Sequence, residues 1–340
     1  MKVGGNTILI TGAAGFIGAA LAKNLIQQDE NIIGLDNLNT YYDKNLKIAR
    51  IDTLKNNKNW KFYQASIDDN TSINNIFKNH KPNIVVNLAA QAGVRNSLKD
   101  PISYVESNIS GFVKILECCR KYNVENFIYA SSSSVYGQNA SFPSKEVDPV
   151  DHPISLYAAS KRSNELIAHS YSHLFKIPCT GLRFFSVYGP WGRPDMAPII
   201  FAKSILERTK ISVFNQGKMK RDFTYIDDVI EAISKCCYKP ASSNLVNDEN
   251  LTPNISLAPY RLFNIGFGQK IDLLYFIKLL EQNLGETAIK NLLPAQPGDA
   301  LATGANNSLL NEWINFQPKV SIEEGIEKFI LWFKDYYKYK

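Results

Sequence analysis

The chain has 340 residues, of which 45% are hydrophobic and 21% are charged, with a formal net charge of +6. This length suits one large α/β unit or two domains, and the composition is that of an ordinary globular protein. No apolar run approaches the roughly 20 residues that span a bilayer, and no basic stripe with interleaved aromatic residues indicates nucleic-acid binding. The first apolar segment runs into a glycine turn and not into a cleavage site, so we expect no signal peptide and a cytoplasmic location.

The cysteines and histidines predict neither disulfides nor a metal site. The five cysteines form no CxxC pair, and their odd number and apolar neighbours predict reduced, mostly buried thiols. His169 and His173 are four residues apart on a predicted helix, but the stretch between them lacks the glutamate of a zinc-protease motif. We therefore expect no bound metal.

Strands and helices are predicted to alternate along the first half of the chain. Such alternation is typical of a parallel sheet with helices on both faces, and the near-continuous apolar strands agree because such a sheet is buried on both sides. We therefore predict an α/β fold with a doubly wound parallel sheet of the Rossmann type. The predicted strands lie at 7–11, 31–36, 61–67, 83–90, 126–132 and 179–185, and the helices at 15–28, 100–122 and 155–175.

After about residue 186 the pattern becomes irregular and richer in proline and glycine. We interpret this part as a smaller, loop-rich C-terminal lobe that interleaves with the sheet. The predicted nucleotide-binding domain covers 1–185, together with 224–262. The predicted lobe covers 186–223 and 263–340.

Three glycines follow the first predicted strand and open the first predicted helix. Gly12, Gly15 and Gly18 allow a tight turn whose backbone N–H groups can approach a pyrophosphate at the helix N-terminus. Asp36 ends the second predicted strand, where its carboxylate can accept hydrogen bonds from ribose hydroxyls and would repel a 2′-phosphate. The pattern predicts NAD as the cofactor in preference to NADP, and the alternative is a glycine turn without a ligand.

A tyrosine and a lysine four residues apart suggest proton transfer. If 155–175 is a helix, Tyr157 and Lys161 lie on one face, and a nearby ammonium lowers the pKa of a phenol. Such a pair can exchange a proton with a sugar hydroxyl while hydride moves at carbon. Serines 131–134 end a predicted strand on the side where ligands bind in such sheets. Taken singly, the YxxxK spacing is common on helix surfaces and a serine run can be a simple loop.

Together these features resemble the NAD-dependent nucleotide-sugar epimerases of the extended short-chain dehydrogenase/reductase family. The resemblance spans nearly the whole chain and implies NAD that stays bound between turnovers, with the sugar nucleotide in the C-terminal lobe. It is carried by "TGAAGFIG", "NLAAQAGVR", "SSSSVYG", "YAASK", "GLRFFSVYGPWGRPDMA", "FNQGKMKRDFTYIDD", "FNIG" and "QPGD". Ser132 then matches the catalytic serine, Tyr157 the base and Lys161 its partner.

The resemblance also implies the residues that contact the cofactor and the substrate. Phe214, Asn215 and Arg221 match residues that hold uracil and diphosphate, and Asp299 matches a ribose contact. The expected cofactor contacts are Gly12, Gly15, Phe16, Ile17, Gly18, Asp36, Asn37, Ser66, Ile67, Leu88, Ala89, Ala90, Gln91, Asn108, Tyr157, Lys161 and Phe184. The expected substrate contacts are Arg95, Ser132, Ser186, Arg193, Phe214, Asn215, Arg221 and Asp299.

Two positions depart from the pattern of the family. Ser66 stands where the family usually has an acid that reads the adenine amino group, although a serine can still accept that bond. Ser186 stands where these epimerases usually have threonine, so it keeps the hydroxyl and loses a methyl group. We expect a modest effect of Ser186 on substrate fit.

Within the family, "DNLNTYYDKNLKIAR" and the loop "GPWGRPDMAP" at 189–198 favour UDP-glucuronate as the substrate and UDP-galacturonate as the product of 4-epimerisation. The 4-keto intermediate of a glucuronate is a β-keto acid, which loses CO2 unless its carboxylate is held. A guanidinium offers a charged, planar fork for that purpose, which makes Arg193 the candidate, helped by Ser186.

Several alternatives share much of this chemistry. A UDP-glucose or UDP-N-acetylglucosamine 4-epimerase would keep the whole chemical core, and a UDP-glucuronate decarboxylase would use the same first step. A 4,6-dehydratase needs an acid near the serines, which "SSSSVYG" lacks, and a non-catalytic NAD-binding protein would tend to lose Tyr157 or Lys161. Apolar residues on more than one face of 101–122 and 157–175 favour a homodimer.

Overall fold

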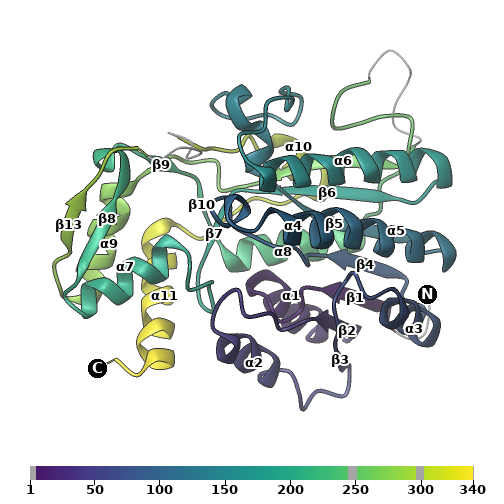
Figure 1. Cartoon of the computed structure of the whole chain (residues 1–340), viewed down its shortest axis with the longest axis horizontal. Helices are drawn as coiled ribbons and strands as arrows, with labels where there is room; N and C mark the ends of the chain where they lie inside the picture. The colour runs from purple at the N-terminus through teal and green to yellow at the C-terminus, as the bar shows by residue number, and fades with distance from the viewer. Residues whose placement is uncertain (1–4, 244–250, 296–301, 340) are drawn as a thin grey trace.

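A computed structural model gives the architecture and describes residues 5–243, 251–295 and 302–339 (Figure 1). Its centre is a seven-stranded sheet in the order β3-β2-β1-β4-β5-β6-β11, and every pair of neighbouring strands is parallel. The predicted doubly wound parallel sheet is confirmed. The strands are β1 (Thr7–Thr11), β2 (Asn31–Asp36), β3 (Trp60–Gln64), β4 (Ile84–Asn87), β5 (Asn126–Ser132), β6 (Cys179–Phe184) and β11 (Tyr260–Ile265).

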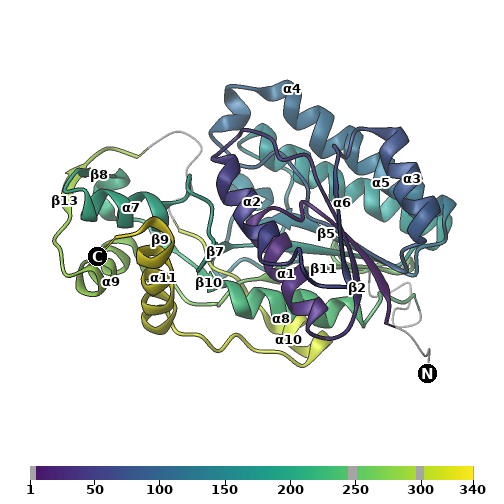
Figure 2. The same cartoon turned by 90° about the horizontal axis from the view of Figure 1, so that it is seen from below.

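The central strands β1, β4 and β5 are buried at nearly every position because both faces of the sheet are covered. Alternate side chains of one strand enter different cores: Ile8 and Ile10 pack into the cluster on one face, whereas Leu9 packs into the cluster on the other. Figures 1 and 2 show helices on both sides of the sheet. On the first face lie α1 (Phe16–Ile26), α8 (Ile226–Cys237) and α10 (Ser308–Ile314), and on the second lie α3 (Asn70–His80), α4 (Pro101–Tyr104), α5 (Phe112–Lys121) and α6 (Leu156–Phe175).

The helix expected at 100–122 is interrupted in its middle. Between α4 and α5, the segment η2 (Val105–Gly111) is a π-helical stretch, a form that occurs mostly as a short bulge and often at functional sites. It contains the buried Asn108, whose side chain reaches across to another segment of the chain. Helical periodicity in the sequence does not reveal such a bulge, because it adds only one residue to the local turn.

The chain leaves the sheet twice to build a smaller group of elements beside it (Figure 2). It leaves after β6, returns through α8 and β11, and then leaves again, while α10 packs back against α8 and β11. The elements of the first excursion are β7 (Ser186–Tyr188), α7 (Ala197–Leu206), β8 (Lys210–Val213), η4 (Phe214–Gly217), β9 (Lys220–Arg221) and β10 (Phe223–Tyr225). Those of the second are β12 (Ile271–Asp272), α9 (Leu273–Leu284), β13 (Ile289–Leu292) and α11 (Ile322–Tyr337).

Three global features bear on function. All five cysteines are buried and none is bonded to another. Across the described ranges, no helix has the length and apolar character needed to cross a membrane. In the same part of the chain, no group of three or more histidine, cysteine, aspartate or glutamate residues is arranged to hold a metal ion.

Candidate active site

A cavity of about 470 Å³ opens where the sheet strands end. Its wall includes the carboxyl ends of β1, β2, β4, β5 and β6 and the loops that follow them. The strand order reverses between β1 and β4, and in doubly wound sheets such a switch point is where ligands bind.

The glycine turn between β1 and α1 forms the floor of this cavity. Gly12 has a φ of +70°, and a Cβ at Gly18 would lie only 2.1 Å from the Gly12 carbonyl oxygen. Larger residues would therefore push the helix N-terminus away from the strand. The Asp36 carboxylate accepts hydrogen bonds from the backbone N–H groups of Ala14, at 3.1 Å, and Leu38, at 2.8 Å. Asp36 thus orders the turn that a pyrophosphate would approach.

Most of the predicted cofactor contacts meet in the wall of this cavity although they come from six separate segments. The members present are Gly12, Gly15, Phe16, Ile17, Gly18, Asp36, Asn37, Ile67, Leu88, Ala89, Ala90, Gln91, Tyr157, Lys161 and Phe184.

Two predicted cofactor residues, Ser66 and Asn108, do not line the cavity. Ser66 stands between Ala65 and Ile67, which both do. Asn108 is 2% exposed; its amide donates to the Gln91 carbonyl and to Ser160 Oγ, both at 3.0 Å, and its side-chain oxygen accepts from the Gln91 N–H at 2.7 Å. Asn108 therefore acts one layer behind the wall, where it fixes the backbone of Gln91 to α6.

The three predicted catalytic residues lie together on the wall. Tyr157 and Lys161 are one helical turn apart on α6, and the Lys161 Nζ is 6.0 Å from the centroid of the Tyr157 ring. Lys161 also donates to the carbonyl oxygen of Ala130 at 2.9 Å, which ties α6 to β5. Ser132 ends β5, where its hydroxyl donates to Ser134 Oγ at 3.0 Å and lies near enough to the Tyr157 phenol to lower the pKa of that phenol.

Burial shifts the pKa values of both Tyr157 and Lys161. Burial raises the pKa of the Tyr157 phenol above its ordinary value, although the hydrogen bond with Ser132 and the charge of Arg193 pull it down in part. Burial also lowers the pKa of Lys161 to about 8. The pKa of the phenol is therefore not lowered below its ordinary value, although the sequence led us to expect such a lowering. The burial that brings the two side chains together disfavours charge on both of them.

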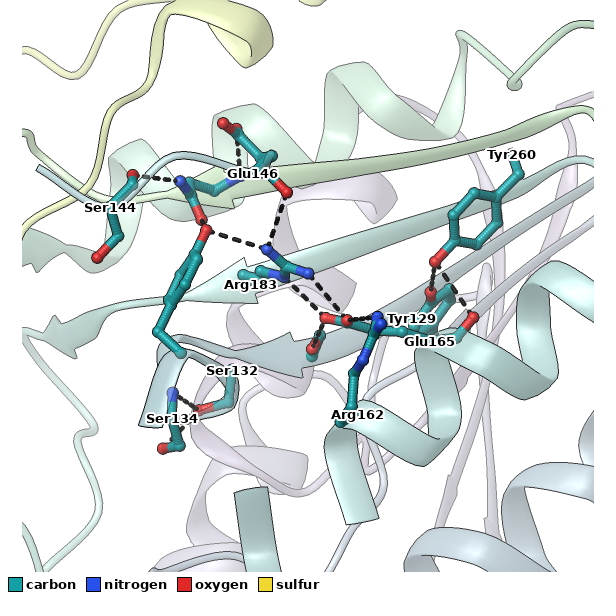
Figure 3. Close-up of polar contacts among 12 residues, drawn as sticks. Tyr129, Ser132, Ser134, Ser144, Glu146, Arg162, Glu165, Arg183 and Tyr260 are labelled. Carbon is teal, nitrogen blue, oxygen red and sulfur yellow. Dashed lines mark hydrogen bonds and ion pairs between the residues drawn. The ribbon is translucent and has the colours of Figure 1, made fainter. Parts of the chain in front are cut away.

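A buried polar network contacts β5, the strand that carries Ser131 and Ser132 (Figure 3). The Glu165 carboxylate accepts from Ser131 Oγ at 2.6 Å, and from Arg183 through Nε at 2.8 Å and Nη2 at 3.0 Å. Arg183 also donates to the hydroxyl of Tyr136 at 3.1 Å, and both members of the ion pair are fully buried. The network thus fixes β5, β6 and α6 relative to one another, directly beside Ser132.

Arg193 and Ser186 line the same cavity as Tyr157. The Arg193 guanidinium is held within its own loop, because Nε donates to Asp195 Oδ1 at 3.0 Å and Nη2 donates to Asp195 Oδ2 at 2.6 Å. Asp195 Oδ2 also accepts from the hydroxyl of Tyr41 at 3.1 Å. The loop arginine is therefore part of the site and is paired with two residues that the sequence did not single out.

A second residue that sequence reasoning missed is Arg50 on α2 (Lys44–Asp52). Arg50 is 2% exposed, and its Nη1 donates to the Ala14 carbonyl in the glycine turn at 3.0 Å. Its Nη2 donates to the carbonyls of Trp191, at 2.6 Å, and Gly192, at 3.2 Å. Arg50 thereby joins the cofactor turn to the loop that carries Arg193. The sequence stretch that could have pointed to Arg50 is "DNLNTYYDKNLKIAR", which ends in this arginine.

The remaining predicted substrate contacts in the described ranges are absent from the wall of the first cavity. Arg95 lines a second cavity of about 420 Å³ that shares Tyr41 and Arg193 with the first, and its guanidinium lies 4.9 Å from the centroid of the Phe214 ring. Asn215 belongs to η4 and Arg221 to β9, and neither residue lines either of these two cavities. Asp299 lies outside the described residues.

Comparison with known proteins places this geometry in a family. The model of the NAD dependent epimerase/dehydratase family matches residues 8–250. The chain belongs to this family. Membership confirms the predicted family and makes NAD the cofactor, in agreement with the glycine turn and Asp36.

Related members cover almost the entire chain. Protein CapI of Staphylococcus aureus is 50% identical over 332 residues, which are 97% of this chain and 99% of that protein. A probable UDP-glucuronate 4-epimerase of Rhizobium meliloti is 42% identical over 332 residues, 97% of both chains. The crystal structure of the UDP-glucuronic acid 4-epimerase from Bacillus cereus, in complex with UDP-glucuronic acid and NAD, has a TM-score of 0.85 at 34% identity and covers 97% of this chain and 100% of that one.

Proposed function

We propose that this protein is a UDP-glucuronate 4-epimerase, which inverts C4 of the sugar to give UDP-galacturonate. The observation that carries the proposal is the position of Arg193, a cation in the wall of the same cavity as Tyr157 and Ser132. Its charge acts on the pKa of the Tyr157 phenol, so the guanidinium lies close to the proposed reacting group. The identity of about 40% with relatives of this name supports the same substrate.

The residues present fit NAD. The close approach of α1 to β1 at Gly18 leaves room for a pyrophosphate against backbone N–H groups, and Asp36 stands at the end of β2 where ribose hydroxyls can reach its carboxylate. NAD, when bound, supplies the hydride acceptor and donor for C4 of the sugar. The other parts of the reaction are the work of the side chains.

Tyr157 is the proposed base that takes the proton of the sugar 4-hydroxyl. Ser132 lines the same cavity as Tyr157 and can orient that hydroxyl beside the phenol. Ser132 and the charge of Arg193 oppose the burial that raises the phenol pKa, and Lys161 in its charged form, 6.0 Å from the Tyr157 ring centroid, would favour the phenolate further. The same phenol returns the proton after the 4-keto sugar has turned over in the cavity, so the overall reaction has no net redox change.

Arg193 explains how such a site can avoid decarboxylation. The 4-keto intermediate carries its carboxylate two carbons from the ketone, and CO2 leaves when the breaking bond lines up with the carbonyl π system. A guanidinium that binds the carboxylate keeps this bond out of line, and Ser186 on the same wall offers a further hydrogen bond. The proposal therefore gives Arg193 the role of separating epimerisation from loss of CO2.

The direct test is incubation of the protein with UDP-glucuronate, without an added electron acceptor, followed by NMR of the products. We expect UDP-galacturonate, and its absence or the appearance of UDP-xylose would contradict the proposal. Tyr157→Phe should abolish conversion and leave NAD bound. Arg193→Leu should lower kcat/KM for UDP-glucuronate at least about tenfold more than kcat/KM for UDP-glucose, because only UDP-glucuronate has a carboxylate that the guanidinium can bind.

We further propose a homodimer, a sugar-nucleotide-binding lobe formed by 186–223 and 263–340, and a cytoplasmic location. Exposed apolar side chains on α4, η2 and α6 support the dimer: Ile102 is 63% exposed, Val105 43% and Leu166 55%. The stacking of Arg95 on Phe214, at the border of the second cavity, supports the lobe. Five buried, unpaired cysteines support a reducing compartment.

A further inference from the structure

The pairing of Arg193 with Asp195 uses one defined edge of the guanidinium. Both hydrogen bonds come from the Nε–Nη2 edge, at 3.0 Å and 2.6 Å, and each ends on a different oxygen of the Asp195 carboxylate. The neighbouring Nη1–Nη2 edge carries a second pair of parallel N–H donors in the same plane. A carboxylate bound on one edge therefore leaves the other edge correctly shaped for a second carboxylate.

Asp195 is placed to keep this pairing. Only Pro194 separates the two residues, and the fixed φ of proline restricts how far their side chains can part. Tyr41, from the segment after β2, donates its hydroxyl to Asp195 Oδ2 at 3.1 Å, and its ring centroid lies 5.9 Å from the Arg193 guanidinium carbon. Asp195 is thus held by contacts from two segments 154 residues apart.

The opposite charges of Arg193 and Asp195 stabilise the contact between them. Burial opposes ionisation of Asp195, but the hydrogen bonds and charge of Arg193 outweigh burial and hold the pKa of this carboxyl below its ordinary value. Asp195 is therefore an anion at neutral pH. The side chains are 23% exposed for Arg193 and 31% for Asp195, so the pair is screened less than a surface ion pair.

We propose that Asp195, fixed by Tyr41, is a positioning residue that holds the Nε–Nη2 edge of Arg193 and thereby directs the Nη1–Nη2 edge at the carboxylate of the sugar. This inference rests on the proposed function. Asp195 does not touch the substrate. Its effect is to present a rigid two-donor fork, which costs less conformational entropy on binding than a free arginine side chain.

The proposal has a consequence for the products. In decarboxylation the bond between C5 and the carboxyl carbon breaks, its electron pair forms the enolate of the 4-ketone, and a proton then adds at C5. A loosely held Arg193 lets the carboxylate rotate into line with the ketone more often. Loss of Asp195 should therefore raise the fraction of turnovers that end in CO2, an effect that a neutral sugar cannot show.

The test is a comparison of wild type, Asp195→Asn and Tyr41→Phe with UDP-glucuronate and with UDP-glucose. We expect Asp195→Asn to lower kcat/KM for UDP-glucuronate about tenfold to a hundredfold, mainly through KM, because a small misplacement of a binding group has effects of that size. Tyr41→Phe should lower it about threefold, as expected for one hydrogen bond. Both variants should release more CO2 per epimerisation, and kcat/KM for UDP-glucose should stay near the wild-type value.

Matched controls and a double variant separate positioning from other effects. Asp52→Asn removes an exposed aspartate of α2, and Tyr275→Phe removes a hydroxyl that donates to Glu323 at 2.6 Å in the lobe. Neither control should change the product ratio. In an Arg193→Ala background, Asp195→Asn should have no further effect, because the residue through which it acts is absent.

Three results would overturn the inference. The first is a lower KM of Asp195→Asn for UDP-glucuronate, which would make Asp195 a competitor of the substrate for Arg193. The second is an equal loss of kcat/KM with both sugars. The third is a double variant whose loss of kcat/KM is the product of the losses in the two single variants. If the wild type itself does not convert UDP-glucuronate, the proposed function fails. If the wild type converts it and Asp195→Asn behaves identically, only the positioning role of Asp195 fails.

Discussion

At the scale of single residues, Lys161 is the group whose charge varies within the working pH range. Burial lowers its pKa to about 8, whereas Tyr157, one turn earlier on α6, has a raised pKa. Raising the pH through about 8 removes the ammonium that favours the Tyr157 phenolate. We therefore expect kcat/KM for UDP-glucuronate to fall as the pH rises through this value, and a pH profile from about 6 to about 10 measures it.

The alternative outcome for Lys161 is informative. If formation of the phenolate alone limited the reaction, kcat/KM would keep rising towards the pKa of Tyr157, and an increase up to about pH 10 would contradict the assigned role of Lys161. Stability in buffer must be followed in parallel by circular dichroism, so that a falling alkaline limb is not mistaken for unfolding.

At the scale of elements, Arg50 ties helix α2 to the glycine turn and to the loop that carries Arg193, the proposed contacts of the cofactor and of the sugar. It donates to Ala14 in the glycine turn and to Trp191 and Gly192 in the loop before Arg193. Arg50→Lys keeps the charge but cannot make all these bonds, so we expect a free energy of unfolding lower by about 1–3 kcal/mol. The use of UDP-glucuronate should fall more than that of UDP-glucose, as measured by denaturant titration and steady-state kinetics.

Arg120→Lys is the matched control for Arg50→Lys. Arg120 is an exposed residue of α5 that pairs with Glu117 at 2.8 Å, and its replacement should leave both stability and sugar preference unchanged. A wild-type stability and sugar preference for Arg50→Lys would show that the loop is positioned by other contacts. The candidates are the rings of Trp332 and Tyr336 on α11, which pack against Trp191.

At the scale of the whole molecule, the ion pair between Glu165 and Arg183 lies at the centre of the described part of the chain. Both side chains are fully buried, so removal of one charge leaves the other buried without its partner. Glu165→Gln should lower the free energy of unfolding by about 3–5 kcal/mol. Guanidinium titration measures this change, and Glu117→Gln on the exposed surface should have little effect by comparison.

The contribution of the Glu165–Arg183 ion pair to the free energy of unfolding depends on pH, and the direction follows from the pKa shift of Glu165. Burial raises the pKa of Glu165, but the charge and hydrogen bonds of Arg183 outweigh it, so the pKa lies below the usual value of 4.5. The pair therefore stabilises the fold above that pH, and the contribution is lost as the pH falls through the folded-state pKa. The stability difference between wild type and Glu165→Gln should shrink in acid, and a constant difference would contradict this account.

The proposed dimer is also a prediction about the whole molecule. Leu166 on α6 is 55% exposed and lies on the same side of the sheet as the exposed Ile102 of α4. Leu166→Glu would place a charge in the proposed apolar interface, so sedimentation should give a dimer for wild type and a monomer for the variant. A monomeric wild type at micromolar concentration would exclude the dimer.

Local patterns in the sequence determined the main elements and the chemically reactive groups. The apolar strands, the glycine turn with Asp36, and the spacing of Tyr157 and Lys161 are short-range features, because strand and helix periodicity repeat within a few residues. Arg193 could be predicted to lie at the cavity because its loop follows a strand at the ligand-binding edge of a parallel sheet. The family resemblance added Ser132 and most of the cofactor wall.

Only the tertiary structure decided which groups meet across long sequence separations. The contact between Tyr41 and Asp195 spans 154 residues and that between Arg50 and Trp191 spans 141, and neither leaves a periodic signal in the sequence. Likewise, Asn108 lies behind the cavity because its amide satisfies the buried backbone of Gln91. Pairing of buried polar groups is a demand of the packed interior, and a one-dimensional pattern does not contain the packing that imposes it.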